Sequence, residues 1–196
     1  MARRAERTVA AASERAPALA LLEVNSIARG VFCVDAMVKR APVELLMSRT
    51  VSPGKHLTLL AGEVAPVEEA MAAGVAAAGA ALVDRLLLPY AHAALAPAIG
   101  GLVLPGPLSA VAIIETFTVA ATLQAADAAC KAAEVALVEM RLGQGLGGKA
   151  FFTLSGELTD LEAAVAAAVA AIDPGLLFGR EVIAAPHDDL REKLLF

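Results

Sequence analysis

The sequence predicts an α+β protein built from two tandem βαββαβ units, each an antiparallel sheet with both helices on one face. Three observations predict this fold. Strand-length apolar runs alternate with alanine-rich helical stretches, and glycine and proline punctuate the chain at similar places in both halves. The third is an internal repeat, in which charged residues and glycines recur in order: Glu23 and Glu115, Asp35 and Asp127, Lys39 and Lys131, Gly54 and Gly148, Glu63 and Glu157.

The elements of the first unit follow from these patterns. Residues 18–24 are an apolar strand, and 28–40 form a helix with Val31, Val34 and Val38 on one face. Strands are expected at 43–47 and 56–60, on either side of a Ser-Pro-Gly turn that can continue neither a helix nor a central strand. A helix with Pro66 in its first turn runs to about Gly79, and a last strand covers 83–88.

The second unit repeats this order. Strands are expected at 110–116, 135–142, 150–154 and 176–184, helices at 120–132 and 158–172, and a terminal helix at 188–195. The domain boundaries are therefore a flexible amino-terminal extension over 1–17, a first domain over 18–97, a linker over 98–109 and a second domain over 110–196. A unit of about 80–90 residues buries only about 60–70% of its unfolded surface, so each would gain from a large interface.

The composition favours an assembly. Hydrophobic residues make up 58% of the chain and charged residues only 19%, and the mean hydropathy is +0.68. Such a chain either spans a membrane or hides much of its surface against other proteins. The longest uncharged run, 86–114, is interrupted by prolines and glycines, which predicts a strand, a short helix and a loop. We therefore expect no lipid membrane as a partner.

Other partners and chemistries are disfavoured in the same way. The net charge of −5 and the few aromatic residues argue against nucleic acid. Cys33 and Cys130 lie in apolar helical stretches at non-equivalent positions of the repeat, as expected for buried free thiols in a reducing compartment. The three histidines are scattered without a nucleophile or paired carboxylates, and no phosphate-binding or dinucleotide motif has the required context. We expect no enzyme activity, no cofactor and no metal.

Two loops at equivalent positions are the candidate functional feature. Glycine lets backbones converge where side chains would collide, and both loops combine it with small or polar residues and a following lysine. One interpretation is a ring of amides and hydroxyls suited to small polar or anionic metabolites, helped by the lysine ammonium groups. The other is a pair of tight turns with solvated lysines. The loop residues are Ser52, Pro53, Gly54 and Lys55, and Gln144, Gly145, Leu146, Gly147, Gly148 and Lys149.

Each unit resembles the shell-protein domain of bacterial microcompartments. The motifs that carry the resemblance occur in both units: LLEVNSIARG and IIETFTVAA, VDAMVKRAPVEL and ADAACKAAEVAL, SPGKHLTLLAGEV and GGKAFFTLSGEL. The family's terminal Pro-His matches only Pro186-His187, since the first unit has Pro-Tyr-Ala-His ending at His92. The arrangement is similar to the tandem, non-permuted shell proteins, in particular the subgroup of the propanediol-utilisation compartment.

This resemblance implies a homotrimer that forms a pseudohexagonal tile in the shell within the cytoplasm, packed with hexameric and pentameric shell proteins. It implies that the two loops surround a central pore and that Lys39 and Lys131 lie at the tile edge. In that subgroup the first pore loop can carry a cysteine where this chain has Ser52. A hydroxyl does not replace a thiolate as a ligand for iron–sulfur iron, so no cluster is expected. The chain is thus predicted to be a non-enzymatic shell subunit. A ferredoxin-like trimeric small-ligand regulatory protein, or a small enzyme of another type, are the alternatives.

Overall fold

The computed structural model describes residues 18–101 and 109–191, and it contains the two expected units. The first unit consists of β1 (Ala18–Val24), α2 (Ile27–Arg40), β2 (Glu44–Val51), β3 (Lys55–Gly62), α3 (Val64–Ala78) and β4 (Leu82–Leu88). A short helix, α4 (Leu95–Ile99), follows it. The second unit consists of β5 (Ala110–Thr116), α5 (Val119–Ala132), β6 (Ala136–Leu142), β7 (Ala150–Gly156), α6 (Leu158–Ala171) and β8 (Leu177–Ile183), and α7 (Asp188–Arg191) comes last.

Both units contain a four-stranded antiparallel sheet of the same topology. The strand orders are β2-β3-β1-β4 and β6-β7-β5-β8, so the predicted α+β fold is confirmed. The registers also match. Leu21 lies between Leu59 and Leu86, as Ile113 lies between Thr153 and Glu181, and each edge strand β2 and β6 carries a bulge at the same place.

Capping and close packing explain the helices that matter for the site. The Ser26 hydroxyl accepts a hydrogen bond from the backbone N–H of Arg29 at the start of α2, and Thr118 does the same for Ala121 in α5. Because Gly30 has no side chain, α2 can lie directly on His56 of β3, where a Cβ would stand 2.3 Å from the imidazole Cγ.

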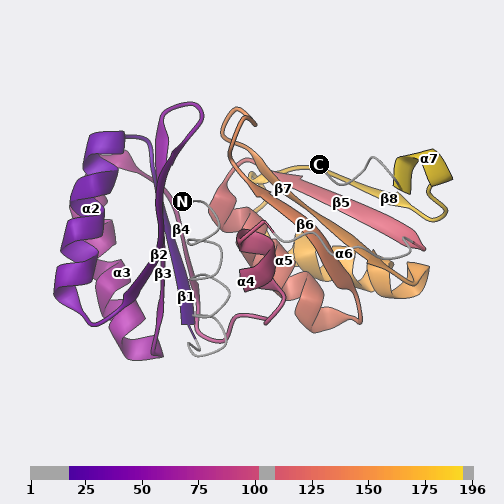
Figure 1. Ribbon diagram of the computed structural model, residues 1–196, viewed down its shortest axis with the longest axis horizontal. Coiled ribbons are helices and arrows are strands. Elements are labelled where there is room, and N and C mark those ends of the chain that lie inside the picture. The colour runs from indigo at the N-terminus through magenta and orange to yellow at the C-terminus, as the bar shows by residue number, and fades with distance from the viewer. Residues whose placement is uncertain (1–17, 102–108, 192–196) are drawn as a thin grey trace.

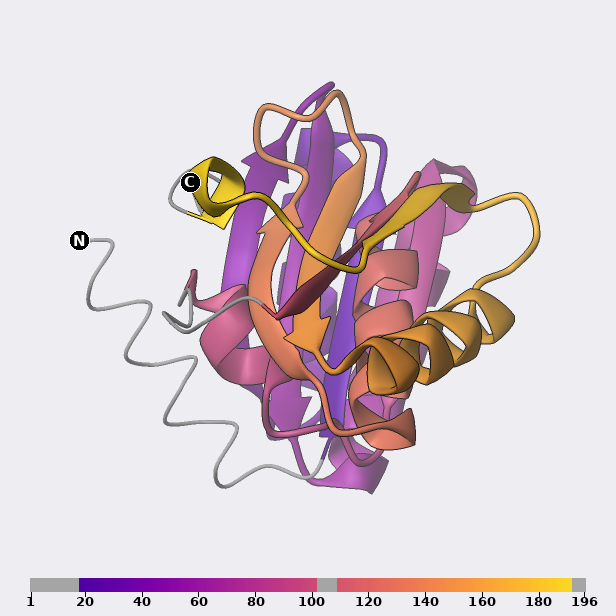
Figure 2. The same ribbon diagram turned by 90° about the vertical axis from the view of Figure 1, so that its right-hand side faces the viewer.

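The helical and sheet layers alternate across the molecule. Figure 1 shows α2 and α3 on one face of the first sheet and α5 on the other, so this sheet lies between two helical layers. α5 and α6 pack in turn on one face of the second sheet. Within residues 18–101 and 109–191, the outer face of the second sheet has no helical layer of this kind. Figure 2 views the molecule from that side, with the second unit in front of the first.

The buried core is therefore in two parts. One apolar cluster lies beneath α2 and α3 and belongs to the first unit alone. The other joins the outer face of the first sheet to α4, α5 and the core of the second unit. Because the second unit's core continues into the joint between the units, the two units pack as one body.

Some boundaries differ from those expected. β2 extends to Val51 rather than residue 47, because its register with β3 continues to the turn. By contrast, α3 begins at Val64 and has Pro66 in its first turn, as predicted. The expected division between first domain and linker at residue 97 falls inside α4. The extension 1–17, most of the linker and residues 192–195 of the expected terminal helix lie outside the described residues, as does Phe196.

Candidate functional site

The two candidate loops lie against each other at one end of the molecule. The turn between β2 and β3 meets the loop between β6 and β7 where Gly148, at φ +90°, approaches Pro53 so closely that a Cβ would stand 2.9 Å from its Cδ. An open depression is lined by residues of both loops together with Ile27 and Thr50. The structure thus brings together two segments that are far apart in the sequence, as a shared site requires.

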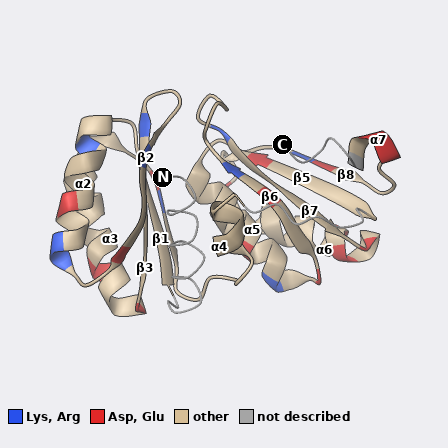
Figure 3. Cartoon of the chain, in the orientation of Figure 1, with Lys and Arg blue, Asp and Glu red and all other residues tan. Residues whose placement is uncertain are grey.

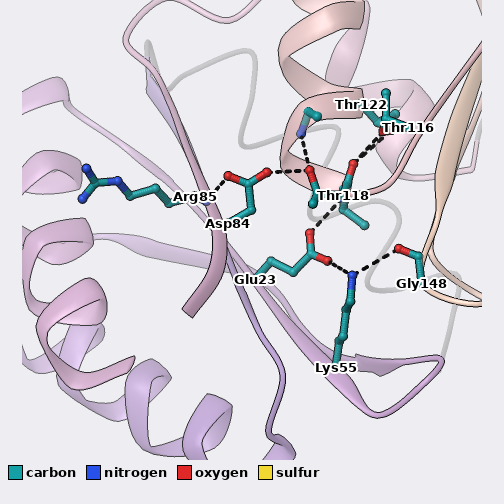
Figure 4. Close-up of polar contacts among 10 residues, drawn as sticks. Glu23, Lys55, Asp84, Arg85, Thr116, Thr118, Thr122 and Gly148 are labelled. Atoms are coloured by element: carbon teal, nitrogen blue, oxygen red, sulfur yellow. Dashed lines mark hydrogen bonds and ion pairs between the residues drawn. The ribbon is translucent and has the colours of Figure 1, made fainter. Parts of the chain in front are cut away.

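The lysines that follow these loops are ion-paired rather than free. The Lys55 ammonium contacts the Glu23 carboxylate at 2.6 Å and donates to the carbonyl of Gly148 at 3.3 Å (Figure 4). The Lys149 ammonium contacts Glu115 at 2.5 Å and lies 3.7 Å from the ring centroid of Phe178. The expectation that free ammonium groups would favour anions needs correction, because each charge is neutralised by its neighbouring carboxylate.

Glu23 links this loop region to the joint between the units. Its second oxygen accepts a hydrogen bond of 2.8 Å from the backbone N–H of Val119, at the amino terminus of α5, where a negative charge is favoured (Figure 4). Burial raises the pKa of this carboxyl, and the hydrogen bond from Lys55 opposes that rise. Sequence reasoning used Glu23 only as a marker of the repeat and missed this role. The sequence signal that could have indicated it is that a glutamate recurs at the equivalent position, Glu115, at the end of an otherwise apolar strand.

Three further polar contacts fasten the joint. The Thr118 hydroxyl donates to the carboxylate of Asp84 (Figure 4), and the Arg49 guanidinium donates to the carbonyl of Leu142 at 3.3 Å. The backbone N–H of His92 donates to the Asp127 carboxylate at 2.7 Å. All of these contacts run from the first unit to the second, so the joint is specific as well as apolar.

The His92 turn has an equivalent at the end of the second unit. His92 Nδ1 accepts from the N–H of Ala94 at 3.3 Å, and His187 Nδ1 accepts from the N–H of Asp189 at 3.2 Å. The carbonyls of the two histidines accept from Leu95 and Leu190 in the same way. The Pro-His dipeptide itself occurs only at Pro186-His187. The turn occurs in both units, although the proline lies at a different position in each.

The joint is formed by the outer face of α5 and the outer face of the first sheet, and the equivalent faces of α2 and of the second sheet are exposed. The outer face of α5 is buried, with Val119 and Leu123 at 0% and 1% exposure, whereas Ile27 and Val31 at the equivalent positions of α2 are 46% and 58% exposed. The second sheet repeats the contrast. The Glu23 side chain is 0% exposed and that of Glu115 is 32% exposed. Large apolar residues also stand open beside Glu115, in Phe117 and Phe178.

The two predicted edge lysines lie in the last turns of equivalent helices. Lys39 of α2 contacts Asp35 at 2.7 Å, and Lys131 of α5 contacts Asp127 at 2.6 Å, each pair one helical turn apart. Figure 3 shows basic and acidic positions interspersed along α2. Lys39 is well exposed and Lys131 is about half exposed, so both ammonium groups are accessible to another molecule.

Other reactive groups do not form a centre. Both cysteines are buried free thiols, as expected, and burial beside Asp127 raises the pKa of Cys130 to about 11. Burial lowers the pKa of His56, whose imidazole contacts the Ser48 hydroxyl at 3.2 Å. Across the described ranges, no cluster of His, Cys, Asp and Glu could hold a metal ion, and none of their helices is long and apolar enough to cross a membrane.

The comparison with known proteins agrees with the doubled fold. The BMC domain family matches residues 18–91 and again residues 110–186. The bacterial microcompartment shell protein PduT of Citrobacter freundii is 44% identical over 179 residues, covering 91% of this chain and 97% of PduT. The chain belongs to the bacterial microcompartment shell proteins. It is a tandem BMC-domain protein, and this family is structural rather than enzymatic.

Three further matches agree with this assignment, the last of them in fold alone. The shell protein EutK of Salmonella typhimurium is 41% identical over 61 residues, covering 31% of this chain and 37% of EutK. A crystal structure of a microcompartment protein from Desulfitobacterium hafniense is 43% identical and superimposes with a TM-score of 0.80, covering 89% of this chain and 98% of that one. A fused permuted hexameric shell protein of the RMM microcompartment, at 22% identity and a TM-score of 0.58, shares the fold.

Proposed function

We propose that three copies of this shell protein close into a six-lobed tile that packs into a microcompartment facet and carries a central pore. The observation that carries the proposal is that the joint inside the chain has a second, uncovered set of the same surfaces. Each copy contributes two similar units, so three copies supply the six lobes of a hexagonal lattice site.

The internal joint is the template for this assembly. Within the chain, the outer face of α5 covers the outer face of the first sheet, and residues such as Leu57 and Leu123 are fully buried there. The outer face of α2 is the counterpart of α5, and the outer face of the second sheet is the counterpart of the first. Placing α2 of one copy on the second sheet of the next would bury both. Such a head-to-tail contact forms a ring when its rotation closes.

The polar contacts support the same arrangement. Glu115 corresponds to Glu23, and the N–H of Ile27 corresponds to that of Val119, at the amino terminus of a helix capped in the same way. In the ring, the Glu115 carboxylate would accept from Ile27 of the neighbouring copy. Arg141 corresponds to Arg49 and would reach the β2–β3 turn of that copy, as Arg49 reaches the carbonyl of Leu142. The apolar surface and the charged groups therefore point to one docking geometry.

The pore would be formed where three pairs of loops meet. Both loops lie at the same end of the sheets, and glycine leaves the backbone of the second loop open at Gly145 and Gly147. Since Lys55 and Lys149 are neutralised by Glu23 and Glu115, the lining would be polar but without net charge from these residues. Small polar metabolites suit such a lining, and anions would be held by backbone N–H groups rather than by lysines.

Lys39 and Lys131 would form the contacts between tiles. Both stand in the last turns of equivalent helices, and each is oriented by an acidic residue one turn earlier. Hexameric and pentameric shell proteins are the proposed partners at this edge, because the family resemblance implies a mixed lattice.

Co-expression with hexameric and pentameric shell proteins tests the proposal. Negative-stain images should show this chain incorporated into closed shells, and the purified chain should form trimers that assemble into sheets or tubes. A chain that stays outside purified shells and never forms trimers at any concentration would contradict it.

A further inference from the structure

A short helix that follows the first unit covers part of the second. After β4 the chain passes through the His92 turn into α4, which packs beside α5 on the helix-bearing face of β6. Leu95 and Ile99 of α4 are buried there, and so is Leu137, which the register with Leu154 places on the same face. The edge strand of the second sheet is thus protected by a segment that the other unit supplies.

The equivalent strand of the first unit has no such cover among residues 18–101 and 109–191. Leu45 pairs with Leu60 as Leu137 pairs with Leu154, so the two residues hold the same position. Leu45 is nevertheless 38% exposed, whereas Leu137 is 2% exposed, and Ser48 further along β2 is also exposed. This face of β2 lacks the helix that its counterpart has.

The chain carries a second segment of the kind that forms α4. The His187 turn repeats the His92 turn in both of its hydrogen bonds, which makes Leu190 of α7 the counterpart of Leu95. Leu194 follows Leu190 at the spacing at which Ile99 follows Leu95. Figure 1 shows α7 at the far end of the second unit, on the opposite side of the molecule from β2. The segment therefore cannot cover β2 of its own chain.

We propose that the carboxyl-terminal segment, residues 188–196, docks on the helix-bearing face of β2 in a neighbouring copy. Leu190 and Leu194 would cover Leu45 there, as Leu95 and Ile99 cover Leu137 within the chain. This inference rests on the proposed trimer, since the ring brings the end of the second unit of one copy to the first unit of the next.

A second contact would accompany the docking. Within the chain, the N–H of His92 donates to Asp127, which also holds Lys131. The counterparts are the N–H of His187 and Asp35, and Asp35 holds Lys39. The docked segment would therefore fix the carboxylate that orients an edge lysine of the neighbouring copy, and so connect the closing of a trimer with the geometry of its rim.

Cysteine cross-linking of the full-length chain tests this inference. The double variant Leu45→Cys/Leu194→Cys, treated with a short bis-maleimide, should give covalent dimers and trimers on a denaturing gel. The matched control is Leu137→Cys/Ile99→Cys, at the equivalent positions of the internal contact. Its cross-link should form within one chain, so the protein should still run as a monomer on the gel. The wild-type chain, with its two buried cysteines, gives the background.

The outcomes separate this inference from the proposed function. If light scattering shows trimers but Leu45→Cys/Leu194→Cys gives no cross-links between chains, the docking is overturned and the proposed trimeric tile still stands. An absence of trimers would overturn both. As a second readout, Leu194→Asp should raise the concentration needed for trimer formation at least tenfold. Leu45→Asp should raise this concentration in the same way, although Leu45 is exposed in the single chain. Unchanged trimer formation in both variants would contradict the contact.

Discussion

Val31 offers a quantitative test of the joint between copies. Its side chain is 58% exposed on the outer face of α2, and the proposed ring would bury it on the second sheet of the neighbouring copy. Val31→Ala removes two methyl groups, each worth about 0.8 kcal/mol when it passes from full exposure to burial. Because the ring would newly bury only the 58% of this side chain that is exposed, about 1 kcal/mol is lost at each joint. Three joints lose about 3 kcal/mol, or about a hundredfold in the trimer's overall dissociation constant.

Sedimentation over a concentration series measures this effect. The concentration at which half of the chains are trimeric scales as the square root of the trimer's dissociation constant, so it should rise about tenfold in Val31→Ala. The free energy of unfolding of the single chain should change by less than about 0.5 kcal/mol, because an exposed valine contributes little.

Leu123→Ala is the matched control, because Leu123 occupies the equivalent position in the internal joint. It is 1% exposed, so its truncation should destabilise the single chain by about 2–5 kcal/mol in urea or thermal unfolding. The reasoning is refuted if Val31→Ala leaves the trimer's concentration dependence unchanged, or if Leu123→Ala leaves the chain's stability unchanged.

Four further predictions concern the rim, the core and the loop region. Lys39→Ala should abolish sheets and tubes in negative-stain images while light scattering still shows trimers, and intact sheets would remove Lys39 from the edge. Burial lowers the folded-state pKa of His56 below its ordinary value, so the free energy of unfolding should fall as pH drops through about 6.5. In urea unfolding, His56→Gln should lose less stability between about pH 7.5 and 5.5 than the wild-type chain does. An equal loss in the two proteins would contradict this. Gly30→Ala should destabilise the chain by about 1–3 kcal/mol through contact with His56, and an added His56→Ala should recover most of that in thermal unfolding. Glu23→Gln should lower the free energy of unfolding by about 1–3 kcal/mol, because the mostly buried Lys55 ammonium loses its paired carboxylate. An unchanged urea midpoint would show that this pair does not hold the joint.

Much of the fold could be predicted because local signals and the repeat agree. The apolar runs, the Ser-Pro-Gly turn and the alanine-rich helices give the strand and helix order in both units, and Ser26 and Thr118 cap their helices at equivalent places. The exposure of the two lysines at the ends of α2 and α5 also follows from the helical pattern.

The joint could not be predicted, because it depends on side-chain pairings between distant segments. Glu23 is buried against α5 and neutralises Lys55, a contact that no local pattern indicates. The equivalence of His92 and His187 was hidden because the prolines before them lie at different positions, while the hydrogen bonds of the turn are the same. The cover that α4 provides for β6 was missed for a similar reason, since a five-residue helix has too little periodicity to show which surface it contacts.

A side-chain-resolution structure of the purified assembly tests the central claim most directly. We predict a threefold ring with six lobes, in which the Glu115 carboxylate of each copy accepts a hydrogen bond from the backbone N–H of Ile27 in the next, as Glu23 accepts from Val119 within the chain. A monomer or dimer, or a trimer in which the outer face of α2 remains open to solvent, would contradict it.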